Sequence, residues 1–315
     1  MIESEAKEQG RRAGVLSEPP RLLDRVTPNH VTPAPFPYLI VPNALDADYY
    51  RELEAALPTI DMLSDNDRHC NNRRVDLISS SGRAELSIEQ SSNVWQEFLA
   101  FHASQAYVNQ VISLFADHVP QCSSRLYQEI VEPPWKRSIY DGREASGGQK
   151  YSMLKPILSL GKTKWMNNFS QPNTLEVTGR ATLALNTPVR EQTSVRGPHV
   201  DSRHKFYVGL FYLRHPADRS SGGDLVLYRW KAGKSKQRWA ANIKDDDVEI
   251  IEVIPYRPNS YVLFLNTSDA IHGVSVRSIS NVPRYLCVTS GWFASAPARA
   301  IGEAMNGEGI GIYAK

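Results

Sequence analysis

Apolar residues recur in short, closely spaced runs from about residue 178 onward. Turn-forming residues separate these runs, among them the Gly222-Gly223 pair and the Pro258-Asn259-Ser260 triplet. Short strands with frequent turn signals are typical of an all-β sandwich or barrel. We therefore expect about eight strands, the number of a jelly roll. They are predicted at 179–187, 196–201, 205–213, 223–230, 248–255, 260–266, 271–277 and 284–293.

The first half of the chain predicts α-helices beside this β-rich region. A strand at 37–41 is followed by apolar residues at helical spacing up to Pro58, with Asn43 placed to cap that helix. Residues 59–91 are mixed and polar, and we interpret them as loop. A wide apolar face over 92–119 predicts the longest helix, packed on the outside of the sheet. The fold class is thus mainly β with flanking α-helices.

We expect one domain between two extensions. Residues 1–35 are polar and rich in proline, which indicates a tail or a strap laid over the domain. We assign 36–295 to a single domain whose jelly-roll core covers 176–295. Residues 296–315 form a C-terminal extension.

Helical and lid elements are expected within 36–175. Its last part, 120–175, holds scattered aromatic residues between prolines and glycines. Such a segment beside a barrel can form a substrate-covering lid or can be ordinary connecting loop, and both interpretations stay open.

Composition excludes some classes of partner. A net charge of +2 and a pI near 8.3 give no general case for nucleic-acid binding. The 3 cysteines are scattered, which argues against a disulfide framework and for a reducing compartment. No apolar run approaches a membrane span, and the N-terminus shows no signal peptide. We expect a soluble cytoplasmic protein, and we leave its oligomeric state open.

Two histidines and an aspartate are the strongest candidates for chemistry. His199 and Asp201 are two residues apart, so in a strand their side chains leave the same face. His272 follows the apolar run at 261–265. Two imidazoles and one carboxylate form the facial triad of non-haem Fe(II) oxygenases, which leaves three coordination positions open. We predict that these three residues bind iron.

With these ligands and the strands around them, the chain resembles the Fe(II)/2-oxoglutarate-dependent dioxygenase superfamily, in particular its prolyl-4-hydroxylase-like branch. The resemblance covers about 175–295 and extends to 37–58. It implies a double-stranded β-helix, with His199 and Asp201 near the end of the second strand and His272 opening the seventh. Related halogenases have a small residue in place of the carboxylate, so Asp201 favours hydroxylation or desaturation.

The same resemblance implies a reaction and its cofactors. An unactivated C–H bond of a small metabolite, amino acid or peptidyl substrate would be hydroxylated or desaturated, with release of succinate and CO2. Fe(II), 2-oxoglutarate and O2 are then required, and ascorbate is an optional addition. The hard chemistry belongs to the metal and the co-substrate, while the protein positions the substrate.

The distal carboxylate of 2-oxoglutarate needs a fixed cation, and a guanidinium fits it with two parallel hydrogen bonds. Arg284 opens the last predicted strand and resembles the arginine that fills this role in the family. Tyr212 matches a tyrosine that adds a hydroxyl, and Ser290 lies on the same strand face as Arg284. Arg277 would lie on the opposite face from His272, so we expect Arg284 to bind the co-substrate.

Substrate identity is not encoded in any motif of this sequence. Several arginines lie near the predicted metal ligands in the sequence: Arg180, Arg190, Arg196 and Arg203. Together with the basic run 231–238, they leave an anionic substrate open, although that run also fits a solvated hairpin. A cupin-like metal isomerase, or a non-catalytic metal-binding or sensor barrel, is the alternative function. Either would typically show a His-x-His pair with a glutamate and would not need Arg284.

Overall fold

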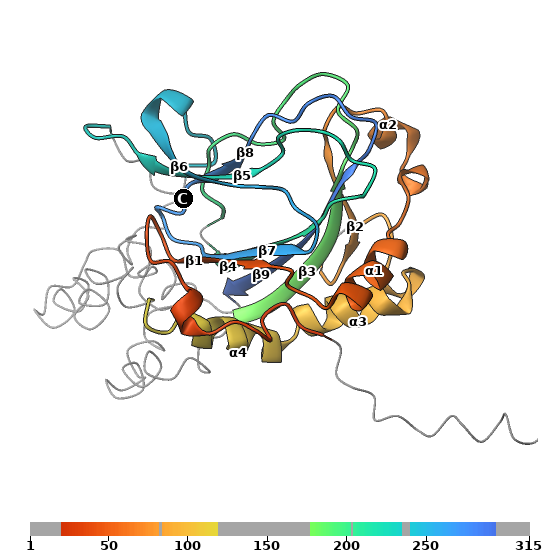
Figure 1. Cartoon of the computed structure of the whole chain (residues 1–315), viewed down its shortest axis with the longest axis horizontal. Helices are drawn as coiled ribbons and strands as arrows, with labels where there is room; N and C mark the ends of the chain where they lie inside the picture. The colour runs from red at the N-terminus through yellow and green to blue at the C-terminus, as the bar shows by residue number, and fades with distance from the viewer. Residues whose placement is uncertain (1–19, 82–83, 119–176, 203, 235–239, 294–315) are drawn as a thin grey trace, which may run out of the picture.

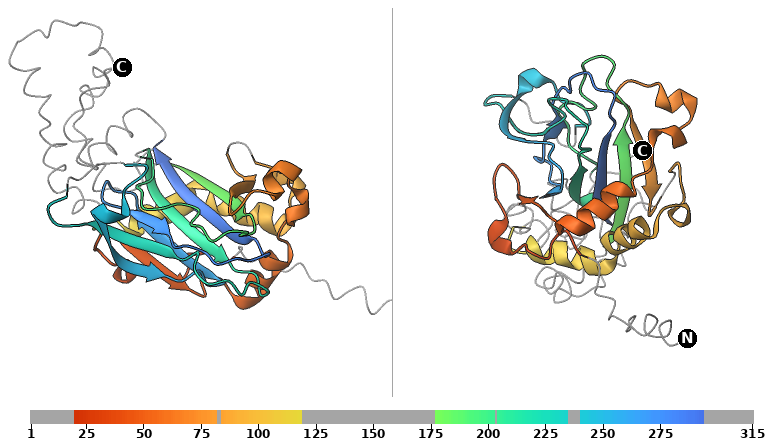
Figure 2. Two further views of the ribbon diagram at one scale, coloured as in Figure 1. Left: turned by 90° about the horizontal axis from the view of Figure 1, so that it is seen from above. Right: turned by 45° about the vertical axis from the view of Figure 1, so that its right-hand side comes forward.

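The computed structural model describes most of the chain, namely residues 20–81, 84–118, 177–202, 204–234 and 240–293. These residues form two antiparallel β-sheets that face one another, with helices α3 and α4 covering the outer face of the larger sheet (Figure 1). The turned views of Figure 2 show the same arrangement, with the red-to-yellow helices beside the larger sheet.

Six strands form the larger sheet. Their order across it is β1 (Tyr38–Pro42), β7 (Ser260–Leu265), β4 (Lys205–Leu213), β9 (Arg284–Phe293), β3 (Val177–Asn186) and β2 (Arg74–Ser79). The smaller sheet has the order β6 (Val248–Ile254), β5 (Leu225–Trp230) and β8 (His272–Val274). From β4 onward the chain passes repeatedly between the two sheets, which is the connectivity of a double-stranded β-helix. The predicted fold class is confirmed.

The helices of the described chain precede β3, except for one short 3-10 turn. They are α1 (Ala47–Ala55), α2 (Asp65–Arg68), α3 (Asn93–His102) and α4 (Gln105–Leu114), with 3-10 turns η1 (Pro28–His30), η2 (Ile60–Met62), η3 (Ile88–Gln90) and η5 (Asp245–Asp247). None of the helices among the described residues is long and apolar enough to cross a membrane.

Alternation along β9 divides the apolar residues into two cores. Tyr285 and Cys287 point outward and join the core that α3 and α4 cover. Leu286 and Val288 point between the sheets, where they pack with Tyr212 and others. Successive side chains of a strand leave opposite faces, so every second residue of β9 lines the space between the sheets. This inner face carries the candidate site.

One predicted strand, 196–201, is wrong. This segment forms only one isolated bridge, between His199 and His272, because its backbone groups bond to different neighbours. His199 exchanges hydrogen bonds with His272, whereas the N–H of Val200 donates to Ala240. Pro198 has no N–H to add to a ladder. By contrast, the predictions at 205–213 and 284–293 coincide with β4 and β9.

The predicted helix over 92–119 is also wrong, because the structure has two helices there. The Ser104 side chain accepts a hydrogen bond from the Tyr107 N–H and caps α4, which makes it a helix start rather than a helix interior. Asp46, not Asn43, caps α1. Residues 59–91 were predicted to be loop, but strand β2 lies within them.

The described part of the N-terminal extension packs on the domain. Leu22 and Leu23 are buried in the outer core, and the Leu22 N–H bonds to His102. Residues 1–19 and 296–315, as well as the predicted lid at 120–175, lie outside the described residues, so those predictions stay as they are.

Candidate metal and co-substrate site

The structure brings the three predicted metal ligands together. His199 and Asp201 lie between β3 and β4, and His272 opens β8. The backbones of His199 and His272 exchange two 2.9 Å hydrogen bonds, and their ring centroids are 4.3 Å apart. Each imidazole Nε2 lies 3.8–3.9 Å from an Asp201 carboxylate oxygen. One ligand atom from each residue falls within 4.8 Å of the others.

Hydrogen bonds fix the tautomer of both histidines. The Nδ1 of His199 lies 2.8 Å from the Gly197 carbonyl, and the Nδ1 of His272 lies 2.9 Å from the Ala270 carbonyl. A carbonyl oxygen can only accept, so each Nδ1 carries the proton and each Nε2 presents a lone pair. Ligands to metals are commonly oriented by such contacts.

The charge states also suit a divalent cation. Burial, assisted by the neighbouring His272 and Arg196, lowers the pKa of His199 to about 3. Burial likewise lowers the pKa of His272. For Asp201, burial would raise the pKa, but His272, Lys205 and His199 together outweigh it and hold that pKa below its ordinary value. At neutral pH the site therefore offers two neutral imidazoles and one carboxylate.

Two cations flank the Asp201 carboxylate. The Lys205 Nζ lies 3.1 Å from one oxygen, and the Arg196 Nη1 lies 3.4 Å from the other. Lys205 was not among the predicted site residues. Its position four residues after Asp201, at the start of a predicted strand, was the available signal.

Arg284 and Tyr212 meet on the inner face. Arg284 is 3% exposed, and its Nη1 donates a 3.3 Å hydrogen bond to the Asn186 Oδ1. Its Cζ lies 5.2 Å from the centre of the Tyr212 ring and 4.5 Å from that of Tyr256. Asn186 and Tyr256 were not predicted, because only the register and the folding of the sheets bring them to Arg284.

Three buried polar atoms around Arg284 have no hydrogen-bond partner within the described part of the chain. They are the Arg284 Nε, the Tyr212 hydroxyl and the Asn186 Nδ2. All three can donate a hydrogen bond, and a carboxylate is an acceptor with several lone pairs. Burying donors without acceptors costs about 1–3 kcal/mol each. The donor set therefore fits the end of a carboxylate ligand.

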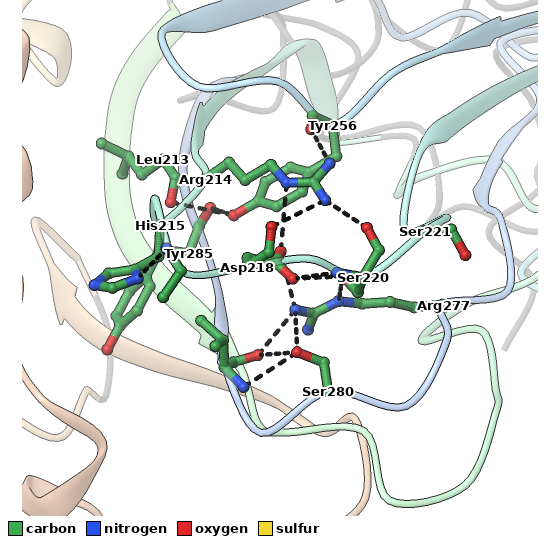
Figure 3. A network of polar contacts seen from close by, with 12 residues as sticks. Leu213, Arg214, His215, Asp218, Ser220, Ser221, Tyr256, Arg277, Ser280 and Tyr285 are labelled. Carbon is green, nitrogen blue, oxygen red and sulfur yellow. Dashed lines mark hydrogen bonds and ion pairs between the residues drawn. The ribbon is translucent and has the colours of Figure 1, made fainter.

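Arg277, the alternative to Arg284, is already occupied. It is 1% exposed, and its Nη2 lies 3.1 Å from the Asp218 Oδ2. It also donates to the Ser220 Oγ at 2.9 Å and to the Val282 carbonyl at 2.8 Å. Figure 3 shows Arg214 approaching the same carboxylate from the other side, at 3.6 Å. Arg277 thus already has a carboxylate partner, which it shares with Arg214, although its buried Nη1 has no hydrogen-bond partner among the described residues.

The sequence had predicted for a different reason that Arg277 would not bind the co-substrate. The prediction placed it on the far face of a strand at 271–277, but β8 ends at Val274, so strand alternation does not reach Arg277. Asp218 belongs to a turn that contacts Arg277 only after folding, and the sequence carries no signal for this pair.

Ser290 does not join Arg284 and Tyr212. It lies on the same inner face but six residues further along β9, where its hydroxyl accepts a 2.9 Å hydrogen bond from the Trp292 Nε1. In the basic run 231–238, Lys234 pairs with Asp247 at 2.8 Å, and residues 235–238 lie outside the described residues.

Comparisons with known proteins give only structural overlaps. No protein-family model matches the chain, and no curated protein matches it. A prolyl 4-hydroxylase from Phytophthora capsici overlaps it with 12% identity and a TM-score of 0.38, over 82% of this chain and 60% of that one. A Pseudomonas putida prolyl-4-hydroxylase overlaps with 14% identity and a TM-score of 0.30, over 82% and 85% of the two chains.

A prolyl hydroxylase from Trichoplax adhaerens, solved with a peptide fragment of the hypoxia inducible factor oxygen degradation domain, overlaps with 11% identity. Its TM-score is 0.30, and the match covers 62% of this chain and 94% of that one. The chain spans about three fifths of the length of the Phytophthora protein. With TM-scores of at most 0.38, the overlaps add no argument to the strand order and the site geometry. The chain is similar in structure to solved prolyl hydroxylases.

Proposed function

We propose that the protein is an Fe(II)- and 2-oxoglutarate-dependent oxygenase that hydroxylates or desaturates a C–H bond of its substrate. The observation that carries this proposal is the set of buried donors around Arg284, a guanidinium with no carboxylate partner among the described residues. They lie between the same two sheets as the His199, Asp201 and His272 triad. A metal triad alone fits several functions, whereas a triad together with a carboxylate pocket fits this one.

His199, Asp201 and His272 would hold the metal. A bound Fe(II) with three protein ligands supplies the O2 chemistry and keeps room for a bidentate co-substrate. The carbonyls of Gly197 and Ala270 hold the two imidazoles in the metal-binding tautomer. Because both imidazoles are neutral and the carboxylate is ionised, binding requires no proton release at neutral pH.

Arg284 would bind the distal carboxylate of 2-oxoglutarate, with Tyr212 and Asn186 as further donors. The apolar wall formed by Leu286 and Val288 keeps water from this pocket, and a charge-assisted hydrogen bond is stronger where water is excluded. Ser290, on the same face, is proposed to contact the co-substrate or the substrate beyond the metal.

The substrate is proposed to be a small metabolite, an amino acid or a peptidyl group, and ascorbate is an optional reductant. Cys70 and Cys287, both free thiols, favour a reducing cytoplasmic location, in which Fe(II) would also be maintained.

Binding measurements test the proposal without a known substrate. Equilibrium dialysis under anaerobic conditions should give one Fe(II) per wild-type chain and almost none for His272→Ala. Arg284→Ala should keep the metal and lose 2-oxoglutarate binding. Iron retained by His272→Ala would refute the triad. Metal binding with no 2-oxoglutarate binding in the wild type would instead favour an isomerase or a sensor barrel.

A further inference from the structure

A cation–aromatic cluster occupies the end of the inner face that is remote from Arg284. The Arg180 Cζ lies 4.3 Å from the centre of the Trp292 ring, and the Lys205 Nζ lies 5.6 Å from it. The indole Nε1 donates to the Ser290 Oγ at 2.9 Å, which fixes the plane of the ring. Arg180 and Trp292 are both partly exposed, so solutes can reach them.

Strand register places this cluster on the same face as the metal site. Arg180 of β3 lies opposite Ser290 of β9, and Lys205 of β4 lies opposite Trp292 of β9. Directly opposed residues of an antiparallel pair share a face, and Ser290 shares its face with Arg284. Lys205 also contacts the Asp201 carboxylate at 3.1 Å. The cluster therefore adjoins the metal ligands.

The charges of this region do not balance within the described residues. Asp201 is shared by Lys205 and Arg196. Arg180 has no carboxylate partner in the described part of the chain, and its buried Nε–H has no hydrogen-bond acceptor there. Among the described residues, the Asp201 carboxylate thus contacts Lys205 and Arg196, and Arg180 has no carboxylate partner.

Stacking on an indole leaves the binding edge of a guanidinium available. The Arg180 Cζ lies over the Trp292 ring, and a cation–π contact uses none of the guanidinium hydrogen-bond donors. Those N–H groups match the oxygens of a carboxylate or a phosphate. Trp292 therefore orients Arg180 without using its donors.

We propose that Arg180, held over Trp292 and assisted by Lys205, binds an oxyanion of the primary substrate, either a carboxylate or a phosphate. This inference rests on the proposed oxygenase function and adds the substrate's charge to it. The co-substrate is a separate anion with its own pocket at Arg284. An anchor beside the metal would hold the anionic end of the substrate and direct its C–H bond to the iron.

Binding at this cluster can be measured without turnover. In the full-length protein labelled with nitrogen-15 at its tryptophans, the Trp292 indole N–H signal is identified as the one lost in Trp292→Phe. Titration with inorganic phosphate and, separately, with acetate should shift this signal saturably. Tighter binding of one of the two anions identifies the substrate's oxyanion. A signal that moves with neither anion overturns the proposal.

Variants decide whether Arg180 is responsible. Arg180→Ala and the milder Arg180→Gln should weaken the binding of the probe anion at least about tenfold, which corresponds to about 1.4 kcal/mol. Arg229→Ala is the matched control, because Arg229 is an exposed arginine of β5 paired with Glu249. Unchanged binding in both Arg180 variants contradicts the proposal.

Turnover then links the anion to the substrate. Matched compounds, each a free acid or phosphate with its amide or alcohol counterpart, are screened for stimulation of succinate formation. Only the anions should stimulate it, and Arg180→Gln should raise the KM for these anions while the co-substrate KM stays unchanged. A raised co-substrate KM would assign Arg180 to 2-oxoglutarate binding and overturn the proposal. Saturable anion binding without any succinate would refute the oxygenase function and leave the anion site standing.

Discussion

Arg284 lies directly opposite Asn186 in the pairing of β9 with β3, and its guanidinium donates a 3.3 Å hydrogen bond to the Asn186 amide oxygen. The bond holds the side chain across the inner face and uses only one of its donors. The Arg284 Nε stays without an acceptor among the described residues. The hydrogen bond with Asn186 thus positions the buried Arg284 guanidinium and leaves it able to bind an anion.

Replacing Arg284 should disable co-substrate binding. A carboxylate left in a buried pocket without its partner loses about 3–5 kcal/mol. We expect Arg284→Ala to raise the co-substrate KM at least about a hundredfold, and Arg277→Ala to change it little, because Arg277 is bound to Asp218. The same kinetic titration with 2-oxoglutarate on both variants decides the matter, and the reverse ranking would move the co-substrate to Arg277.

Arg277 should matter for stability instead. Arg277→Ala leaves the Asp218 carboxylate short of a partner, so the free energy of unfolding should fall by about 3–5 kcal/mol. Arg277→Lys keeps a cation beside Asp218 and should lose less stability than Arg277→Ala. Urea unfolding of the two variants tests the expectation. Equal losses in the two would show that the ion pair is not the cause.

A carboxylate introduced at Asn186 should compete with the co-substrate. Asn186→Asp supplies Arg284 with an internal partner at the position of its present hydrogen bond, so 2-oxoglutarate would have to displace it. The affinity for 2-oxoglutarate should fall at least about tenfold, while iron affinity stays at the wild-type level. Isothermal titration with 2-oxoglutarate gives the result directly, and unchanged affinity would separate Asn186 from the pocket.

The buried His102 is expected to make the fold less stable in acid. Its Nδ1 donates to the Phe98 carbonyl at 2.7 Å, and its Nε2 accepts from the Leu22 N–H. Burial lowers its pKa to about 3, from an ordinary value of 6.5. Between these two values the unfolded chain binds a proton that the folded chain does not. The free energy of unfolding therefore falls as the pH drops below about 6.5, by up to about 1.4 kcal/mol per pH unit.

A variant isolates this contribution from those of the metal ligands, which act with the same sign. Urea unfolding of the wild type and of His102→Gln is compared at pH 7.5 and 5.5. The wild type should lose more stability over this interval. The same loss in both proteins would mean that His102 does not titrate as its burial requires.

Local patterns predicted the continuous apolar strands well. Residues 205–213 and 284–293 are strands with the predicted bounds, because long apolar runs satisfy both the ladder and the core. The strand prediction at 196–201 was wrong because the hydrogen bonds of this segment go to two separate partners. The helix breaks at Ser104 because its side chain caps a new helix. The spacing of apolar residues carries no information about such a cap.

The site residues also divide into those that the sequence predicted and those that it did not. His199, Asp201 and His272 are chemically distinctive residue types, so spacing and strand context predicted that they converge. The groups that tune the site were missed, because their role depends on packing between distant segments. Asn186 reaches Arg284 through sheet register, and Asp218 reaches Arg277 from a turn. Neither contact follows from residue type.

We propose that the triad binds iron for a reaction that consumes 2-oxoglutarate. The most direct measurement is Fe(II)-dependent formation of succinate from 2-oxoglutarate in air, for the wild type and for His272→Ala. The wild type should form succinate, whereas His272→Ala should form almost none, because two remaining ligands do not hold the metal against water. Succinate formed by His272→Ala at the wild-type rate would contradict the account.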